Sequence, residues 1–241
     1  MPRFAYLSAR PQHSAADAEY ESFRTAARLE PGELDRVDLV HERLPADAVD
    51  RWAGFVVGGS PFNVTEPEAA KTDEQVLLEA DLARLATHAA EGRTAALFTC
   101  YGIGIATRTL GGDVSRGYPE DTGPTTITLT EAGTRDPLFG ALPTRFSAVT
   151  AHKEGSAAPP PGAVLLATND ACPVQAYRVG ERLYATQFHP EPTARAFTER
   201  MAIYRDDGYF DAMDYEAIAA RVHATALSEP PRILRAFVGA F

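Results

Sequence analysis

A strand-length apolar run that ends on a cysteine and leads into a helix-compatible segment is the feature that most constrains the fold of this 241-residue chain. The run covers residues 95–99, Cys100 follows at once, and the helical pattern covers 103–110. This order predicts a strand, a sharp turn and a helix, with the thiol at the turn, where a helix dipole favours a thiolate. Free cysteine is also a common buried filler, so the segment alone leaves a nucleophile and a core residue equally open.

Strand-like and helix-like segments alternate along the first 110 residues. Strands are predicted at 4–8, 36–41 and 54–57, and helices at 17–29, with Asp17 as N-cap, at 45–52 and at 73–91. The apolar set expected for the last of these helices is Val76, Leu77, Ala80, Ala83 and Leu85. This order predicts a three-layer, flavodoxin-like α/β fold, in which helices flank a mainly parallel central sheet.

The second half of the chain has a different pattern, because its strand-like segments are separated by turns rather than by helices. These segments predict additional antiparallel strands at 125–129, 145–150, 163–167, 174–179 and 183–187. Helical segments within about 193–241 are expected to pack on the sheet. We expect residues 1–241 to form a single domain.

Composition excludes several classes of function. The net charge of −10 argues against unaided binding to nucleic acid or to an anionic membrane. Two cysteines do not make a disulfide framework, and no Cys/His spacing resembles a zinc site, so we expect no metal and no organic cofactor. The apolar run from Phe4 to Leu7 is too short for a signal peptide, and no stretch of 18 apolar residues occurs. A cytoplasmic protein is expected.

Two further loops follow predicted strands. His189 and Glu191 come after the strand at 183–187, and the glycines of Gly58-Gly59-Ser60-Pro61 come after the strand at 54–57. An imidazole takes and returns a proton near neutral pH, and a carboxylate two residues away can orient it. A His-Pro-Glu tripeptide alone is more typical of a surface turn. Together with Cys100 and a loop that offers backbone N–H groups, it predicts a nucleophilic site at the carboxyl edge of the sheet.

These motifs, in this order, resemble the class I, triad-type glutamine amidotransferases, and among them the stand-alone relatives of the glutaminase half of GMP synthetase. The resemblance covers about residues 50–192 and rests on three segments: 58–61, 100–102 and 187–191. Ala151-His152-Lys153-Glu154 is similar to the His-Gly-Asp segment of that family.

The resemblance implies that Cys100 attacks the side-chain amide carbon of glutamine and that His189, oriented by Glu191, gives a proton to the departing ammonia. Water then hydrolyses the thioester to glutamate. The resemblance also implies that the N–H groups of Gly59 and Tyr101 form the oxyanion hole. The residues expected to contact the substrate are Gly58, Ser60, Gly104 and His152.

Gly104 departs from the family pattern, because the family usually has glutamine four residues after its cysteine. This departure leaves open a hydrolase of another γ-glutamyl or small amide, and a non-catalytic member that binds or regulates. The sequence also has no phosphate-binding P-loop pattern, so ammonia is expected to go to a separate synthase or to be released.

Overall fold

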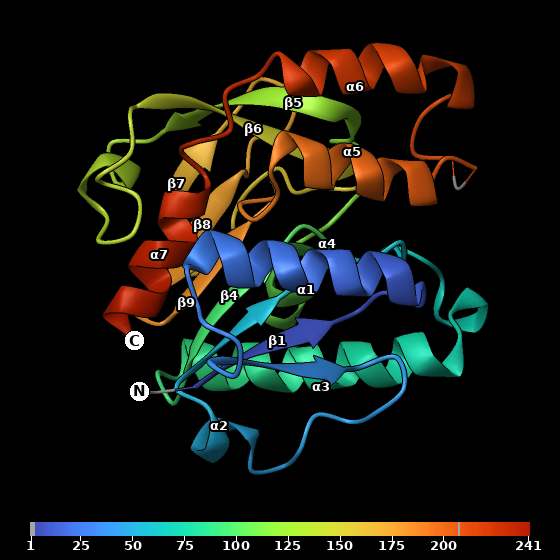
Figure 1. The fold of residues 1–241 in the computed structure, drawn as a ribbon. Coiled ribbons are helices and arrows are strands. Elements are labelled where there is room, and N and C mark those ends of the chain that lie inside the picture. The colour runs from blue at the N-terminus through green and yellow to red at the C-terminus, as the bar shows by residue number, and fades with distance from the viewer. Residues whose placement is uncertain (1–2, 207) are drawn as a thin grey trace.

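The computed structural model describes residues 3–206 and 208–241, and its nine strands form one mixed sheet in the order β2-β1-β3-β4-β9-β8-β7-β5-β6 (Figure 1). The strands are β1 (Phe4–Ser8), β2 (Leu34–Asp38), β3 (Gly54–Val57), β4 (Ala95–Thr99), β5 (Glu120–Leu129), β6 (Arg145–His152), β7 (Val164–Thr168), β8 (Ala176–Val179) and β9 (Leu183–Thr186). From β2 to β9 neighbouring strands are parallel, and from β9 to β6 they are antiparallel. The α/β class, with antiparallel additions in the second half, is therefore confirmed.

Helices cover both faces of this sheet. They are α1 (His13–Ala27), α2 (Ala48–Arg51), α3 (Asp73–Ala90), α4 (Tyr101–Thr109), α5 (Ala194–Ile203), α6 (Tyr215–His223) and α7 (Pro231–Ala240). Among the described residues, no helix is both long enough and apolar enough to cross a membrane. The N-cap expected at Asp17 is wrong, because α1 already begins at His13, after an extended Gln12 that follows Pro11.

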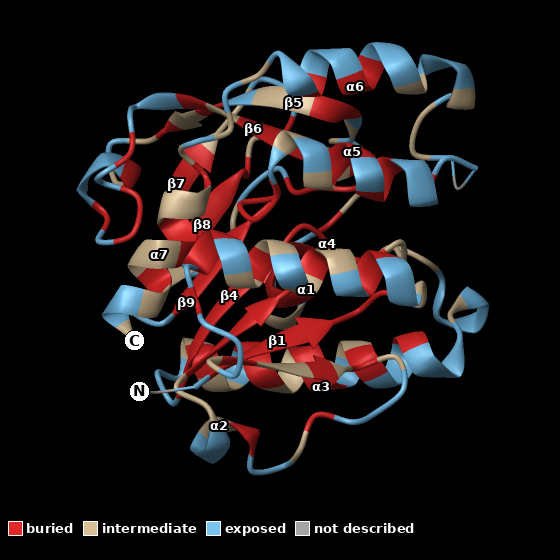
Figure 2. Cartoon of the chain, in the orientation of Figure 1, coloured by how far each residue is buried: buried red, intermediate tan, exposed pale blue. Residues whose placement is uncertain are grey.

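The alternation of side chains along the central strands supplies the two buried layers. In β1, Phe4 and Tyr6 join one hydrophobic cluster, whereas Ala5 and Leu7 join the other. The first cluster includes residues of α1 and α7, and the second includes residues of α3 and α4. Figure 2 shows the central strands buried, with helices that are buried on one side and exposed on the other. The sheet is thus packed between two helical layers.

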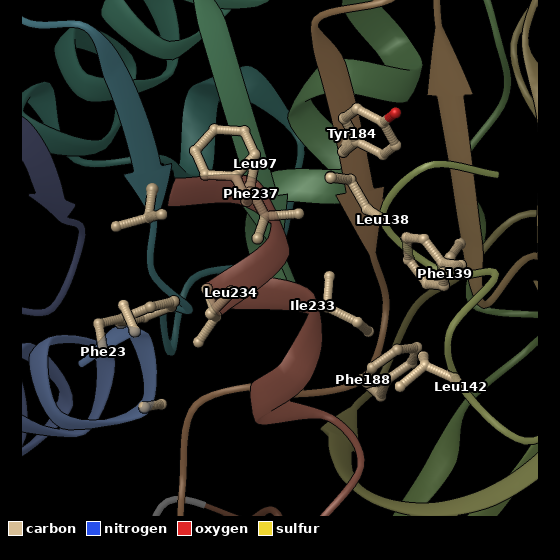
Figure 3. Packing of buried hydrophobic residues seen from close by; sticks show 14 of the residues in the cluster. Phe23, Leu97, Leu138, Phe139, Leu142, Tyr184, Phe188, Ile233, Leu234 and Phe237 are labelled. Atoms are coloured by element: carbon tan, nitrogen blue, oxygen red, sulfur yellow. The ribbon is translucent and has the colours of Figure 1, made fainter. Parts of the chain in front are cut away.

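Helix α7 closes the first layer, as Figure 3 shows. Ile233, Leu234 and Phe237 are fully buried, in one cluster with Phe23 of α1 and Leu97 of β4. Each such side chain stabilises the fold by roughly 1.5–3 kcal/mol through burial. The C-terminal helices therefore belong to the packed structure that supports the central strands.

Helix α3 has nearly the predicted bounds but buries a different face. Val76 and Leu77 are exposed, and of the predicted apolar set only Leu85 is buried. The buried apolar residues recur every three to four positions, at Leu78, Leu82, Leu85, Ala86 and Ala89. The prediction failed because Val76 and Leu77 are apolar yet stand one position out of phase with this stripe.

Candidate active site

The carboxyl ends of the parallel strands meet at one edge of the sheet. In the register, Val57 of β3 lies beside Phe98 of β4, and Phe98 lies beside Ala185 of β9. The loop at 58–61, Cys100 and the segment 187–191 all begin within a few residues of these positions. The three segments that the sequence analysis singled out therefore leave the sheet side by side.

Cys100 occupies the sharp turn between β4 and α4. Its backbone has φ 52° and ψ −105°, a conformation that costs a residue with a side chain about 1–3 kcal/mol. Two backbone hydrogen bonds hold it there: Cys100 N–H donates to Thr186 at 2.8 Å, and Ile103 N–H donates to the Cys100 carbonyl at 3.2 Å. The thiol stands 3.9 Å from the Ala151 carbonyl oxygen. The strained turn thus places sulfur at the first turn of a helix.

His189 and Glu191 form a buried pair next to this turn. The His189 Nδ1 lies 3.0 Å from Glu191 Oε1, and the His189 backbone N–H donates to the Val149 carbonyl at 3.0 Å. Both side chains are almost completely buried. Because the carboxylate accepts a hydrogen bond from the Nδ1–H group, the imidazole is held in one orientation and its Nε2 is not engaged by Glu191.

In this pair, the positive charge of His189 and the negative charge of Glu191 stabilise each other. Burial lowers the pKa of His189, but the Glu191 carboxylate and then Cys100 raise it, and together they bring it to about 9. Burial raises the pKa of Glu191, but His189 and Arg200 outweigh this and bring it to about 2. A hydrogen bond with Cys100 also contributes to the raised pKa of His189. Near neutral pH the pair is therefore an imidazolium and a carboxylate.

Behind Glu191 lies a buried ionic network that the sequence analysis missed. Arg200 of α5 donates to Glu191 at 2.8 Å and to Glu19 of α1 at 3.0 Å. Glu19 also accepts from Arg10 at 2.7 Å and from the Tyr6 hydroxyl at 2.7 Å. Burial raises the pKa of Glu19, but Arg10 and then Arg200 lower it below its ordinary value. Arg200, which is itself held by Glu19, thus fixes the position of Glu191.

The same network lies against the glycine loop. A Cβ on Gly58 would stand 2.2 Å from Glu19 Oε2, so only glycine fits beside this carboxylate. The Gly59 N–H donates to Glu19 at 3.3 Å, and a Cβ on Gly59 would stand 3.0 Å from His189 Cε1. Gly58 and Gly59 therefore allow Glu19 and His189 to approach the loop closely.

The sequence does contain a signal for the buried charges of Glu19 and Arg200, which the motifs did not reveal. Glu19 falls on the apolar face of α1, where Ala15, Ala16 and Phe23 are buried. Arg200 falls in the same way among the buried residues of α5, beside Phe197. A charged residue in phase with a buried stripe indicates a buried ion pair, because an unpaired buried charge is very costly.

Two cavities meet at Cys100 and Ser60. The Phe197 cavity, of about 420 Å³ with its mouth included, is lined by His189, Arg200 and aromatic residues that include Phe197 and Tyr204. The Gly104 cavity, of about 380 Å³, is lined by Tyr101, Gly104, His152, Glu154 and Gln187, among others. The Cys100 thiol is therefore reached from two sides.

Gly104 and Glu154 shape the second cavity. A Cβ on Gly104 would stand 2.9 Å from Val64 Cγ2 and 3.9 Å from Glu154 Oε1. Glu154 is buried and accepts hydrogen bonds from the backbone N–H groups of Val64 and Thr65, the latter at 3.0 Å. The place next to Gly104 is thus occupied by a valine methyl, with a carboxylate beside it.

His152 has both ring nitrogens engaged. Its Nδ1 lies 2.9 Å from the Glu154 carbonyl oxygen and its Nε2 lies 2.9 Å from Glu120 Oε2. Glu120 also accepts from Asn169 at 2.6 Å. The ring therefore lines the Gly104 cavity while it ties β6 to β5.

Two groups of side chains have potential ligand atoms within 4.8 Å of one another. They are Glu120 with His152 and Cys172, and Glu19 with His189 and Glu191. In both groups the carboxylates and imidazoles are bound to protein partners, and burial raises the pKa of Cys172 to about 11. A thiol that keeps its proton is a poor metal ligand, and we derive no metal chemistry from either group.

The structure is thus an α/β protein with a strained cysteine beside a buried His–Glu pair at the carboxyl edge of its parallel strands. This is the arrangement of an enzyme that uses a cysteine nucleophile. The sequence model of the family "Glutamine amidotransferase class-I" matches residues 39–205, so the chain belongs to the class I glutamine amidotransferase family.

The similarity of the chain to individual known proteins agrees with this family assignment. It is 30% identical to the GMP synthase [glutamine-hydrolyzing] of Aeropyrum pernix over 145 residues and 31% identical to that of Thermomicrobium roseum over 138 residues. These matches cover 60% and 57% of this chain but only 25% and 23% of the two synthases. A glutamine amidotransferase of Thermotoga maritima has the same fold, with a TM-score of 0.76, 18% identity, and coverage of 99% of this chain and 97% of that one.

Proposed function

We propose that this chain is a cysteine-dependent glutaminase, which hydrolyses the side-chain amide of glutamine to glutamate and ammonia. The observation that carries the proposal is the pairing of His189 with Glu191 at 3.0 Å next to a cysteine held at φ 52°. Membership of the glutamine amidotransferase family supports the choice of substrate. In this proposal Cys100, His189 and Glu191 are the catalytic triad.

In the first half of the reaction, the Cys100 sulfur, whose proton is held by His189, forms a bond with the amide carbon while the C=O bond opens to an oxyanion. His189, protonated near neutral pH, gives its proton to the amide nitrogen, and the C–N bond breaks to release ammonia. In the second half, water attacks the thioester carbon while His189 takes its proton. The C–S bond then breaks, glutamate leaves, and the proton of Cys100 is again held by His189. Glu191 keeps the imidazole oriented and stabilises its charge throughout.

Both tetrahedral intermediates carry an oxyanion, which needs preplaced N–H donors. The Tyr101 N–H is the first amide of α4, a position without a partner inside the helix. Gly59 is the second proposed donor. Its N–H now donates to Glu19 at the long distance of 3.3 Å, so it serves the oxyanion once it turns from Glu19 toward Cys100. Removal of one such donor typically costs about 10²–10³ in rate.

We also propose where the ammonia goes. The matched region is about a quarter of the length of the GMP synthases, whose names state that they hydrolyse glutamine. We therefore propose a separate synthase in the cytoplasm as the acceptor, with residues 1–241 acting as one domain. Ammonia production that rises when a candidate synthase is added would support this pairing.

The test is glutamate release from glutamine by the purified protein. We expect release by the wild type, none by Cys100→Ala, and unchanged release by Cys172→Ala, since Cys172 is a buried cysteine whose raised pKa keeps it as a thiol. Equal inactivity of wild type and Cys100→Ala on glutamine and on γ-glutamyl amides, with and without candidate synthases, would refute the enzymatic proposal.

A second candidate is the hydrolysis of a larger γ-glutamyl amide. The Phe197 cavity favours it, because it opens on Cys100 from a different side than the Gly104 cavity and its lining, besides His189 and two arginines, includes four aromatic residues: Phe197, Tyr204, Tyr209 and Phe210. In that case the glutamyl part occupies the Gly104 cavity and the amine lies against Phe197. Competition between glutamine and γ-glutamyl amides of apolar amines separates the two, and a clear preference for free glutamine removes this candidate.

A further inference from the structure

We infer that Tyr209 is a specificity-determining residue, which restricts the leaving group of the reaction to ammonia. The inference rests on the proposed function, and it concerns the side of the reacting amide from which the nitrogen departs. Tyr209 lies beyond residue 205, where the match to the family model ends, so the family assignment gives it no role.

The first argument is the place where the two cavities meet. Only three of the described residues line both the Phe197 cavity and the Gly104 cavity: Ser60, Cys100 and Tyr209. The Tyr209 hydroxyl donates to the Ser60 carbonyl oxygen at 3.4 Å. The tyrosine thus reaches from the segment between α5 and α6 to the glycine loop, and these three residues form the throat between the two cavities.

The second argument is the direction in which the amide has to lie. His189, which gives its proton to the leaving nitrogen in the proposed reaction, lines the Phe197 cavity and not the Gly104 cavity. The amide carbon lies at the Cys100 sulfur, with the acyl chain in the Gly104 cavity. The C–N bond therefore points through the throat toward His189, and a substituent on the nitrogen has to pass the ring of Tyr209.

The third argument is that this ring is held in place from several sides. Lys153 Nζ stands 4.4 Å from the centre of the Tyr209 ring, a cation–π contact. The Thr122 hydroxyl donates to the Tyr209 carbonyl at 3.1 Å, and the ring of Tyr204 packs edge-on at 6.2 Å between centroids. Burial, and then Cys100, raise the pKa of the Tyr209 hydroxyl, so it keeps its proton and remains a donor. An unsubstituted amide nitrogen fits beside a ring held in this way, whereas a larger amine has to displace it.

The test compares glutamine with γ-glutamylmethylamide and γ-glutamylbenzylamide, in which the leaving amine is larger. A single extra carbon in a tight pocket typically costs about 10- to 200-fold, so we expect wild-type kcat/KM to fall by about this factor from glutamine to the methylamide. Tyr209→Ala should shrink this fall about tenfold or more, and it should hydrolyse the benzylamide faster than the wild type does. Tyr209→Phe, which keeps the ring, should retain the wild-type preference.

Tyr215→Ala is the matched control, because Tyr215 also follows α5 in the chain but lines neither cavity. Similar wild-type rates on the three amides overturn the inference. An equal fall for all three in Tyr209→Ala also overturns it, since a purely structural role gives that result. Comparison of variant and wild type on the same amide cancels the intrinsic reactivity of that amide. If Tyr209→Ala does not fold, Tyr209→Leu takes its place, because leucine is smaller than tyrosine.

Calorimetric binding to Cys100→Ser protein gives the same comparison without turnover. We expect this protein to bind glutamine but not γ-glutamylbenzylamide, and Cys100→Ser/Tyr209→Ala to bind both. Binding of both amides, or of neither, by Cys100→Ser overturns the inference, even if the wild type releases glutamate as proposed. Selective binding of glutamine by a protein whose wild type never releases glutamate would refute the proposed function and leave the role of Tyr209 standing.

Discussion

Replacement of Gly104 by alanine tests how tightly the wall of the Gly104 cavity is packed. In a helix, Gly→Ala is ordinarily stabilising by roughly 1 kcal/mol. Here the new Cβ would stand 2.9 Å from Val64 Cγ2. Val64 cannot retreat easily, since it is buried, its N–H donates to Glu154, and its carbonyl accepts from Arg108. Overpacking of this kind costs about 1–3 kcal/mol, so we expect Gly104→Ala to destabilise the fold by about 1 kcal/mol net.

Urea denaturation, followed by circular dichroism, measures this change. Gly239→Ala is the matched control, because Gly239 also lies in a helix but a Cβ there would have no neighbour within 4 Å, and it should stabilise or be neutral. Val64→Ala removes the clashing methyl, so the Gly104→Ala/Val64→Ala protein should be more stable than the sum of the single changes predicts, by about 1 kcal/mol or more. The packing argument is refuted if Gly104→Ala stabilises the protein and the two changes are additive.

Three further predictions concern stability. Arg200→Met should lower the free energy of unfolding by about 3–5 kcal/mol, because it removes the partner shared by two buried carboxylates, whereas Arg195→Met on the same helix, which removes an exposed pair, should cost at most about 1 kcal/mol in the same urea assay. The pKa of His189 is raised to about 9 in the fold from an ordinary 6.5. Its contribution to the free energy of unfolding is therefore complete below pH 6.5 and is lost as the pH rises through 9. This loss is on the order of 3 kcal/mol and should be absent in His189→Gln across a pH series. Phe237→Ala should cost about 3–5 kcal/mol and lower the melting temperature, and a loss below 1 kcal/mol would show that α7 is not part of the core.

Most of the fold was predictable because its signals are local. The run before Cys100 and the run before the Gly58 loop are β4 and β3, with the bounds expected. The buried face of α3 was predicted wrongly because Val76 and Leu77 are apolar residues but are exposed. Periodicity gives the existence of an amphipathic helix more reliably than the phase of its buried stripe.

The candidate site was predictable only in part, and for a physical reason. Cys100, His189 and Glu191 each follow a strand, so parallel strand order alone brings them to one edge. Glu19 and Arg200 are 181 positions apart and meet only through the packing of α1 on α5. No local pattern pairs them, although each stands in phase with apolar neighbours.

The measurement that tests the central claim most directly is labelling with a glutamine-derived electrophile, such as its diazoketone analogue, followed by mass spectrometry of the intact and digested protein. We expect one adduct, located on Cys100. Glutamine should slow its formation, and it should form equally in Cys172→Ala. Cys100→Ala should remain unlabelled. Modification of Cys172 in place of Cys100, or labelling that glutamine does not slow, would contradict the assignment of Cys100 as the nucleophile of a glutamine site.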